Sequence, residues 1–175
     1  MTTSSDDPGS ATPWTAGSIL AALADVSRGM EIKDRLRCEP SGEALVEALR
    51  ATPNEREREI LCDVLGDRHE ALAVPALLDQ LDSAELRSSA ADALAKIGDP
   101  SAGGALATWF AREAVPGRRA MLAAALGAVG HRASVPALIQ ALQDESPSVR
   151  GSAAWPQNST NCGFPRILPN CRAAD

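Results

Sequence analysis

A histidine–glutamate pair is the first feature of this sequence that could carry chemistry. His69 is followed directly by Glu70, and an imidazole beside a carboxylate can supply two ligands to an iron site. Such a site needs several convergent ligands, however, and the other histidine, His131, is followed by Arg132 rather than by a glutamate. We therefore interpret His69 and Glu70 as a solvated pair in a turn before a helix at Val74. The sequence predicts no metal and no cofactor.

The cysteines are the next candidates, since a thiol near a base can act as a nucleophile. Cys62 occupies an apolar helical position, which is typical of a small buried side chain. Cys38 follows Arg37, which could lower the pKa of its thiol, but no histidine is nearby. No CxxC pair, phosphate loop or dinucleotide motif is present, so we expect no catalytic residue and free thiols. The four cysteines are Cys38, Cys62, Cys162 and Cys171.

Arginines recur at one position of a repeated unit, near the start of its second helix. One interpretation is a row of guanidinium groups that binds a partner protein. The alternative is a set of structural ion pairs with a carboxylate of the adjacent unit, such as Asp82 or Asp144, and we favour this alternative. The arginines are Arg58 (or Arg56), Arg87, Arg119 and Arg150.

The elements that position these side chains follow from internal repeats. The phrase VPALLDQL at 74–81 returns almost unchanged as VPALIQAL at 135–142, with weaker copies at 43–49 and 104–110. Between these phrases, Gly66, Gly98 and Gly130 are equally spaced along the chain, and each follows a run with helical periodicity. Repeats of this length indicate a stack of similar helical units.

Two helices per unit are predicted, and no alternating β-branched run indicates a strand. Thr52 is expected to cap a second helix, with Pro53 at its first position and Glu55 as the capping-box residue. The three spaced glycines are expected to end helices in the left-handed conformation. The first helices are expected at 43–50, 74–81, 103–111 and 135–143, and the second helices at 54–65, 84–97 and 117–129.

The two ends of the chain differ from the repeats. Residues 1–14 are rich in Ser, Thr, Asp and Pro and predict a disordered arm. Residues 15–42 predict a degenerate pair of capping helices, at about 18–26 and 30–38. Residues 43–154 hold the repeats, and residues 155–175 predict an irregular tail.

The repeat pattern stops at Trp155. Residues 148–154 align with 85–91, but Pro156 then falls where Ala93 lies in the middle of a second helix, and a proline there costs about 3 kcal/mol. Three of the four Asn also lie after residue 157. Residues 155–175 are therefore either the product of a shifted reading frame or a native disordered tail. Both alternatives leave the last unit incomplete, with Leu138, Ile139 and Leu142 partly uncovered.

Charge and hydropathy limit the classes of partner. The net charge of −6 disfavours binding to a phosphate backbone, so we expect no nucleic-acid partner. No run of about 18 apolar residues predicts a membrane span. The first ten residues lack the basic and apolar segments of a secretory signal, and a cytoplasmic location is expected.

The repeated phrases resemble the short HEAT-like repeats described in phycobilisome lyases and widespread in bacteria. The resemblance covers about 43–154 and rests on the Val-Pro-Ala-Leu openings, the recurrent arginines, the Ala-rich run at 90–94 and the Gly-Asp-Pro turn at 98–100. It implies an all-α superhelix (a HEAT-type α-solenoid) of about four helical pairs. It also implies three functions that known members have: protein-binding scaffold, bilin-lyase-like accessory subunit, and deoxyhypusine-hydroxylase-like iron enzyme.

We expect a non-catalytic scaffold that binds another protein on the concave side, lined by the second helices, because stacked repeats commonly bind there. The lyase-like and hydroxylase-like functions remain as alternatives.

Overall fold

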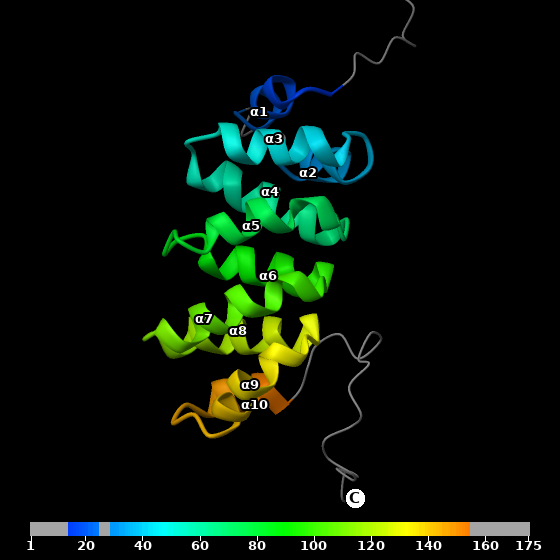
Figure 1. The fold of residues 1–175 in the computed structure, drawn as a ribbon. Coiled ribbons are helices and arrows are strands. Elements are labelled where there is room, and N and C mark those ends of the chain that lie inside the picture. The colour runs from blue at the N-terminus through cyan, green and yellow to red at the C-terminus, as the bar shows by residue number, and fades with distance from the viewer. Residues whose placement is uncertain (1–13, 25–28, 155–175) are drawn as a thin grey trace, which may run out of the picture.

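The repeats fold into an open stack of helical pairs. The structure is a computed structural model and describes residues 14–24 and 29–154. Within these two ranges there are ten α-helices, three short 3-10 turns and no strand. The helices run across the long axis of the molecule and follow one another from α1 to α10 along it (Figure 1). The predicted all-α solenoid is confirmed.

The helices alternate between two layers. The first helices of the five pairs are α1 (Ala16–Ala24), α3 (Gly42–Ala51), α5 (Val74–Gln80), α7 (Gly103–Arg112) and α9 (Val135–Leu142). The second helices are α2 (Gly29–Cys38), α4 (Glu55–Asp67), α6 (Arg87–Ile97), α8 (Pro116–Val129) and α10 (Pro147–Ala154). The 3-10 turns η2 (Ala71–Ala73), η3 (Pro100–Ala102) and η4 (Arg132–Ser134) precede α5, α7 and α9.

The second helices pack tightly because their buried faces carry small side chains. In the middle of the stack α6 lies against both α4 and α8, and α8 in turn lies against α10. Ala90, Ala93 and Ala123 are fully buried at these contacts, together with larger residues such as Leu94 and Leu126. Burying one leucine side chain stabilises a fold by about 1.5–3 kcal/mol. Each pair therefore builds its core both within itself and with its neighbours.

Two of the three spaced glycines end helices as predicted. Gly98 and Gly130 have φ values of 69° and 63°, the left-handed conformation that terminates α6 and α8. The prediction was wrong for Gly66, which lies inside α4. That helix continues to Asp67, and the positive φ of its turn, 52°, belongs to His69.

Gly66 is required by close packing instead. A Cβ atom built on Gly66 would lie 2.8 Å from the Cα atom of Ala93 on α6. Real Cβ atoms essentially never come so close to a backbone atom, so a larger residue would push α4 and α6 apart. The same residue type thus serves the turn at Gly98 and the helix contact at Gly66.

The N-cap of α4 lies two positions after the predicted one. Asn54 is the N-cap, and its side-chain oxygen accepts a hydrogen bond from the backbone N–H of Arg56. The acidic partner is Glu57, which accepts hydrogen bonds from the Asn54 amide and from the Thr52 hydroxyl. Thr52 is buried and instead closes α3 at its C-terminal end. Pro53 therefore lies between the two helices rather than at the first position of α4.

The predictions for both ends fall largely outside the described residues. This holds for residues 1–13 of the expected arm and for the whole tail 155–175, including its proposed origin in a shifted frame. Trp14, the last residue of the expected arm, donates a 3.0 Å hydrogen bond from Nε1 to Glu39 and lies under the guanidinium of Arg35. The predicted capping helices correspond to α1 and α2.

Candidate protein-binding surface

His69 and Glu70 lie in the turn between α4 and η2, where both side chains make structural contacts. His69 Nδ1 is 2.5 Å from the carbonyl oxygen of Lys96, and because a carbonyl can only accept, Nδ1 carries the proton. Glu70 pairs with Arg68 at 3.6 Å. His131 lies two units further on, at the start of η4, where its Nδ1 accepts from the Ala133 N–H. Among residues 14–24 and 29–154, no group of three or more His, Cys, Asp or Glu side chains could hold a metal ion.

The two cysteines in the described ranges differ sharply in environment. Cys62 is fully buried in α4, and burial raises the pKa of its thiol to about 12. Cys38 is exposed at the end of α2. Its neighbour Arg37 turns away to hydrogen-bond Asp67 and Asp34. A buried thiol with a raised pKa is inert at neutral pH, so Cys62 has the structural role that its position predicted.

The recurrent arginines join each unit to the next. Arg87, at the start of α6, donates to the Leu81 carbonyl within its own unit at 2.8 Å. Its Nη1 also lies 2.6 Å from Glu113 of the following unit, and its guanidinium stacks 4.5 Å from the centre of the Trp109 ring. The side chain of Arg87 is 13% exposed and that of Glu113 is 3% exposed. The predicted ion pair with a carboxylate of the adjacent unit therefore exists for Arg87, and its partner is Glu113.

Glu113 stays ionised despite its burial. Burial alone would raise the pKa of this carboxyl group. Hydrogen bonds from the Val115 N–H, at 3.0 Å, and from Arg87 outweigh that effect and hold the pKa of Glu113 below its usual value.

Arg119 repeats the arrangement one unit later. Its Nε and Nη2 atoms donate to the two carboxylate oxygens of Asp144 at 2.7 and 2.9 Å, a bidentate geometry. Its Nη1 donates to the carbonyls of Glu113 and Ala114 at 3.2 and 3.1 Å. Asp144 is one of the two partners that the sequence suggested.

The first and last arginines have no carboxylate partner among the described residues. Arg58 donates to the Pro53 carbonyl at 3.0 Å and to Gln80 of the next unit at 3.5 Å, and its Nε is buried without a partner. Arg150 is exposed and donates to the Asp144 and Glu145 carbonyls at 2.9 and 3.0 Å. A role of these four arginines in binding a partner stays a prediction.

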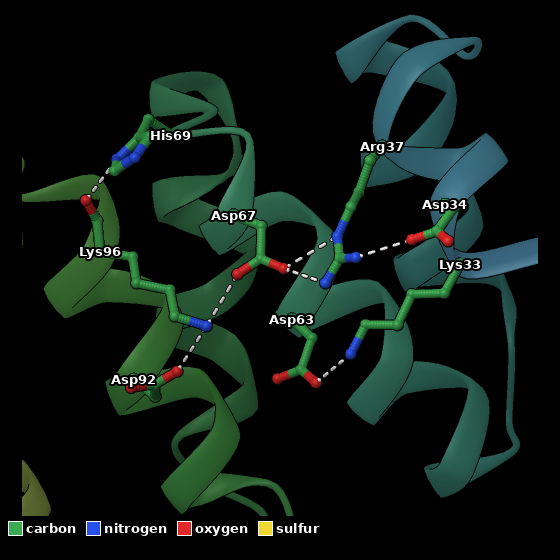
Figure 2. Close-up of polar contacts among 8 residues, drawn as sticks. All are labelled: Lys33, Asp34, Arg37, Asp63, Asp67, His69, Asp92 and Lys96. Carbon is green, nitrogen blue, oxygen red and sulfur yellow. Dashed lines mark hydrogen bonds and ion pairs between the residues drawn. The ribbon is translucent and has the colours of Figure 1, made fainter. Parts of the chain in front are cut away.

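A second row of charges, which the sequence analysis missed, crosses three second helices. Asp67 on α4 accepts from Arg37 on α2 at 2.6 Å and from Lys96 on α6 at 2.9 Å. Figure 2 shows Asp67 between the two cations, with Asp34 and Asp92 at the ends of the row and the pair Lys33–Asp63 beside it. We call these seven residues the charge ladder. The signal was present as opposite charges one repeat apart, with separations of 30, 30 and 29 residues.

The charge ladder stops at α8. When α6 and α8 are aligned so that Arg87 matches Arg119, Ala124 and Ala128 of α8 take the positions of Asp92 and Lys96 of α6. On the same surface Met121 is 37% exposed, and a Cβ atom on Gly117 would meet no atom within 4 Å. From Met121 to Ala128 this surface of α8 carries no charged side chain, and we call the exposed part around Met121 the Met121 face.

No helix in residues 14–24 and 29–154 is both long enough and apolar enough to cross a membrane.

The comparisons with known proteins agree with the geometry of the stack. A family model described as HEAT repeats matches residues 42–127 and 116–155, which run from α3 through α10. No curated protein matches the sequence. The matched residues make up more than half of the chain and include all four recurrent arginines. The chain therefore belongs to the family of HEAT-repeat proteins.

Proposed function

We propose that this chain is a non-catalytic scaffold that binds another protein, and that the partner contacts the Met121 face of the second-helix layer. Stacked repeats offer an extended surface of this kind, and the sequence points to the layer of second helices as the one that lines the concave side. The expected partner is a protein, not a nucleic acid or a membrane.

One observation carries the proposal, namely that the charge ladder ends before α8, where Ala124 and Ala128 take the positions of Asp92 and Lys96. Over α2, α4 and α6 the outer face is occupied by side chains that already pair with one another, such as Asp67 with Lys96. A partner would have to replace those pairs. Between Met121 and Ala128 on α8 it meets no charged side chain, and Met121 is exposed, with a flexible thioether that adapts to many surfaces. Apolar contact there removes area from water without breaking an ion pair.

The arginines contribute to this function in two ways. Arg87 and Arg119 are largely buried and hold adjacent units in register, so their contribution is to the rigidity of the surface. Arg58 spans two units through Gln80 in the same manner. Only Arg150 is exposed enough to meet a partner directly.

Finer assignments rest on the sequence resemblance alone. We infer from the Val-Pro-Ala-Leu openings and the Gly-Asp-Pro turn that the repeats are of the short phycobilisome-lyase type. The expected cytoplasmic location stays a prediction. The lyase-like and hydroxylase-like alternatives have the same basis. The contacts of His69 and Glu70 do not favour the second, because both side chains serve the turn in which they lie.

Site-specific photo-crosslinking in the native cells tests the proposal. A photoreactive amino acid replaces Met121, and the captured proteins are identified by mass spectrometry. We expect one protein to be captured, and its capture to be lost when Ala124→Glu is added, because a carboxylate one turn away would be desolvated by an apolar partner.

A matched control replaces Leu72, which is 45% exposed and belongs to η2 on the other layer. Capture of the same proteins from positions 72 and 121, or capture that ignores Ala124→Glu, would contradict the proposal. Both replaced side chains are exposed, so neither variant should alter the fold.

A further inference from the structure

We infer that the end of the stack formed by α9 and α10 is a second docking surface, and that it takes a helical hairpin of another protein whose turn carries an aspartate or glutamate. We call it the end face and define it by Leu138, Ile139, Leu142 and Arg150. It goes beyond the proposed function, because it is separate from the Met121 face and is recognised by different chemistry.

The apolar part of the end face is revealed by comparing aligned positions. VPALIQAL of α9 aligns with VPALLDQL of α5 and its C-cap, so that Leu142 corresponds to Leu81. Leu81 is fully buried, whereas Leu142 is 42% exposed. Ile139 is 53% exposed, while its counterpart Leu78 packs partly buried against the core. The end face therefore exposes side chains whose counterparts are buried or partly buried in α5, a unit that is followed by a further helical pair.

The polar part of the end face follows from the contacts between units. At each of two successive junctions, an arginine at the start of a second helix is paired with a carboxylate in the inter-helix turn of the next unit. The pairs are Arg87 with Glu113 and Arg119 with Asp144. Both carboxylates come from the turn between a first and a second helix, which fixes the kind of structural element that supplies the charge.

Arg150 occupies the same position at the next junction. Arg119 donates to the carbonyls of Glu113 and Ala114, and Arg150 donates to the carbonyls of Asp144 and Glu145. These two contacts lie at the same distance before each arginine along the chain. The Nη1 atom of Arg150 is therefore anchored as in Arg119. Among the described residues no carboxylate lies within ion-pair distance of its guanidinium, whereas Asp144 holds the corresponding edge of Arg119.

This combination identifies the occupant by its chemistry. A guanidinium that is anchored at Nη1 and has no carboxylate partner among the described residues favours a bidentate carboxylate, and the exposed leucine and isoleucine side chains of α9 favour an apolar helix surface. A helical hairpin with an acidic turn supplies both the carboxylate and the apolar surface, in the arrangement found at the Arg87–Glu113 and Arg119–Asp144 junctions. A second copy of the chain and residues 155–175 are the other possible occupants, and the test distinguishes them.

The test uses a hairpin of known sequence as its probe. A labelled synthetic peptide with the sequence of residues 132–154, covalently stapled within each helix, carries Asp144 in its turn. Its binding to the full 175-residue chain is measured by fluorescence anisotropy. We expect saturable binding that weakens about tenfold on Arg150→Gln in the chain, and by the same factor on Asp144→Asn in the peptide. Combining the two changes should weaken binding no further.

Two variants of the chain separate the end face from other surfaces. Leu142→Lys should abolish binding of the peptide, because it places a charge in the apolar contact, whereas Leu72→Lys should leave binding unchanged. Met121→Glu should also leave it unchanged, so failure of the proposed function and failure of this inference are distinguishable. Far-UV circular dichroism checks that each variant keeps its helices.

The inference is overturned if the peptide does not bind, or if its binding ignores Arg150→Gln. A photoreactive residue in place of Ile139 tests for the other possible occupants by crosslinking. A crosslink from that position to residues 155–175 of the same chain, or to a second copy of the chain, would identify a different occupant and would likewise overturn it. A crosslink only to the peptide supports it.

Discussion

Replacing Glu113 by glutamine should destabilise the stack at the junction between α6 and α7. The side chain of Glu113 is 3% exposed and lies 2.6 Å from Arg87, which is itself 13% exposed. Glutamine keeps the shape and can still accept the hydrogen bond from the Val115 N–H. The change therefore removes the charge and leaves a guanidinium largely buried without its counter-ion.

The expected size of the effect follows from the partners that Arg87 retains. Removing one member of a buried ion pair typically costs about 3–5 kcal/mol. Arg87 keeps its hydrogen bond to the Leu81 carbonyl and its contact with the Trp109 ring, so we expect a loss of about 2–3 kcal/mol. For a chain of this length that corresponds to a fall in melting temperature of roughly 4–12 °C.

A double-mutant cycle with Arg87→Met isolates the pair from its surroundings. Urea unfolding is followed by far-UV circular dichroism for the wild type, both single variants and the double variant, and is fitted with a model of coupled repeats. We expect a coupling free energy of at least about 1.5 kcal/mol at neutral pH. A value below about 0.5 kcal/mol would refute the reasoning, since the pair would then be no better than an exposed one.

The same pair predicts the response to acid. The pKa of Glu113 is lower in the folded chain than in the unfolded chain, so the unfolded state binds more protons as the pH falls. The stabilisation by Glu113 is complete above the unfolded pKa and is lost as the pH falls through the folded pKa. The Glu113→Gln variant should therefore lose less stability than the wild type over that acidic range. Parallel curves for the two proteins would contradict this assignment.

Two further predictions concern packing and reactivity. Gly66→Ala should cost about 1–3 kcal/mol in urea unfolding, because its methyl group meets the backbone of Ala93, whereas the matched change Gly104→Ala, in open space on another helix, should not destabilise. An equal effect of the two changes would show that helix propensity, not contact, decides. Iodoacetamide at neutral pH should modify the exposed Cys38 much faster than the buried Cys62, as measured by peptide mass spectrometry. In denaturant the two rates should become equal.

The glycines show how far the sequence alone predicted the fold. Their regular spacing predicted the repeat and the ends of α6 and α8 correctly. It could not distinguish a glycine needed for a left-handed turn, such as Gly98, from one needed for close approach, such as Gly66. The distinction depends on where the neighbouring helix lies, and that is set by the packing of all the units rather than by any local pattern.

The arginines show the same limit for the candidate site. Their recurrence predicted an inter-unit contact, and Asp144 was a correct partner for Arg119. The partner of Arg87, Glu113 in the turn of the following unit, was not identified from the sequence. Which carboxylate reaches a given arginine depends on how the units stack, and that is not readable from the local sequence. The charge ladder was missed for the same reason.

The two sets of charges differ in how freely evolution can change them. Arg87 and Arg119 are nearly buried and engage carbonyls as well as carboxylates, so losing one leaves several polar groups unpaired. Pairs of the charge ladder, such as Lys96–Asp92, are partly exposed and contribute at most about 1 kcal/mol each. Replacing one such pair by alanines, as at Ala124 and Ala128 of α8, therefore costs the stack little. It removes the paired charges from the surface of one unit, and a repeat stack can acquire a binding face in this way without losing its register.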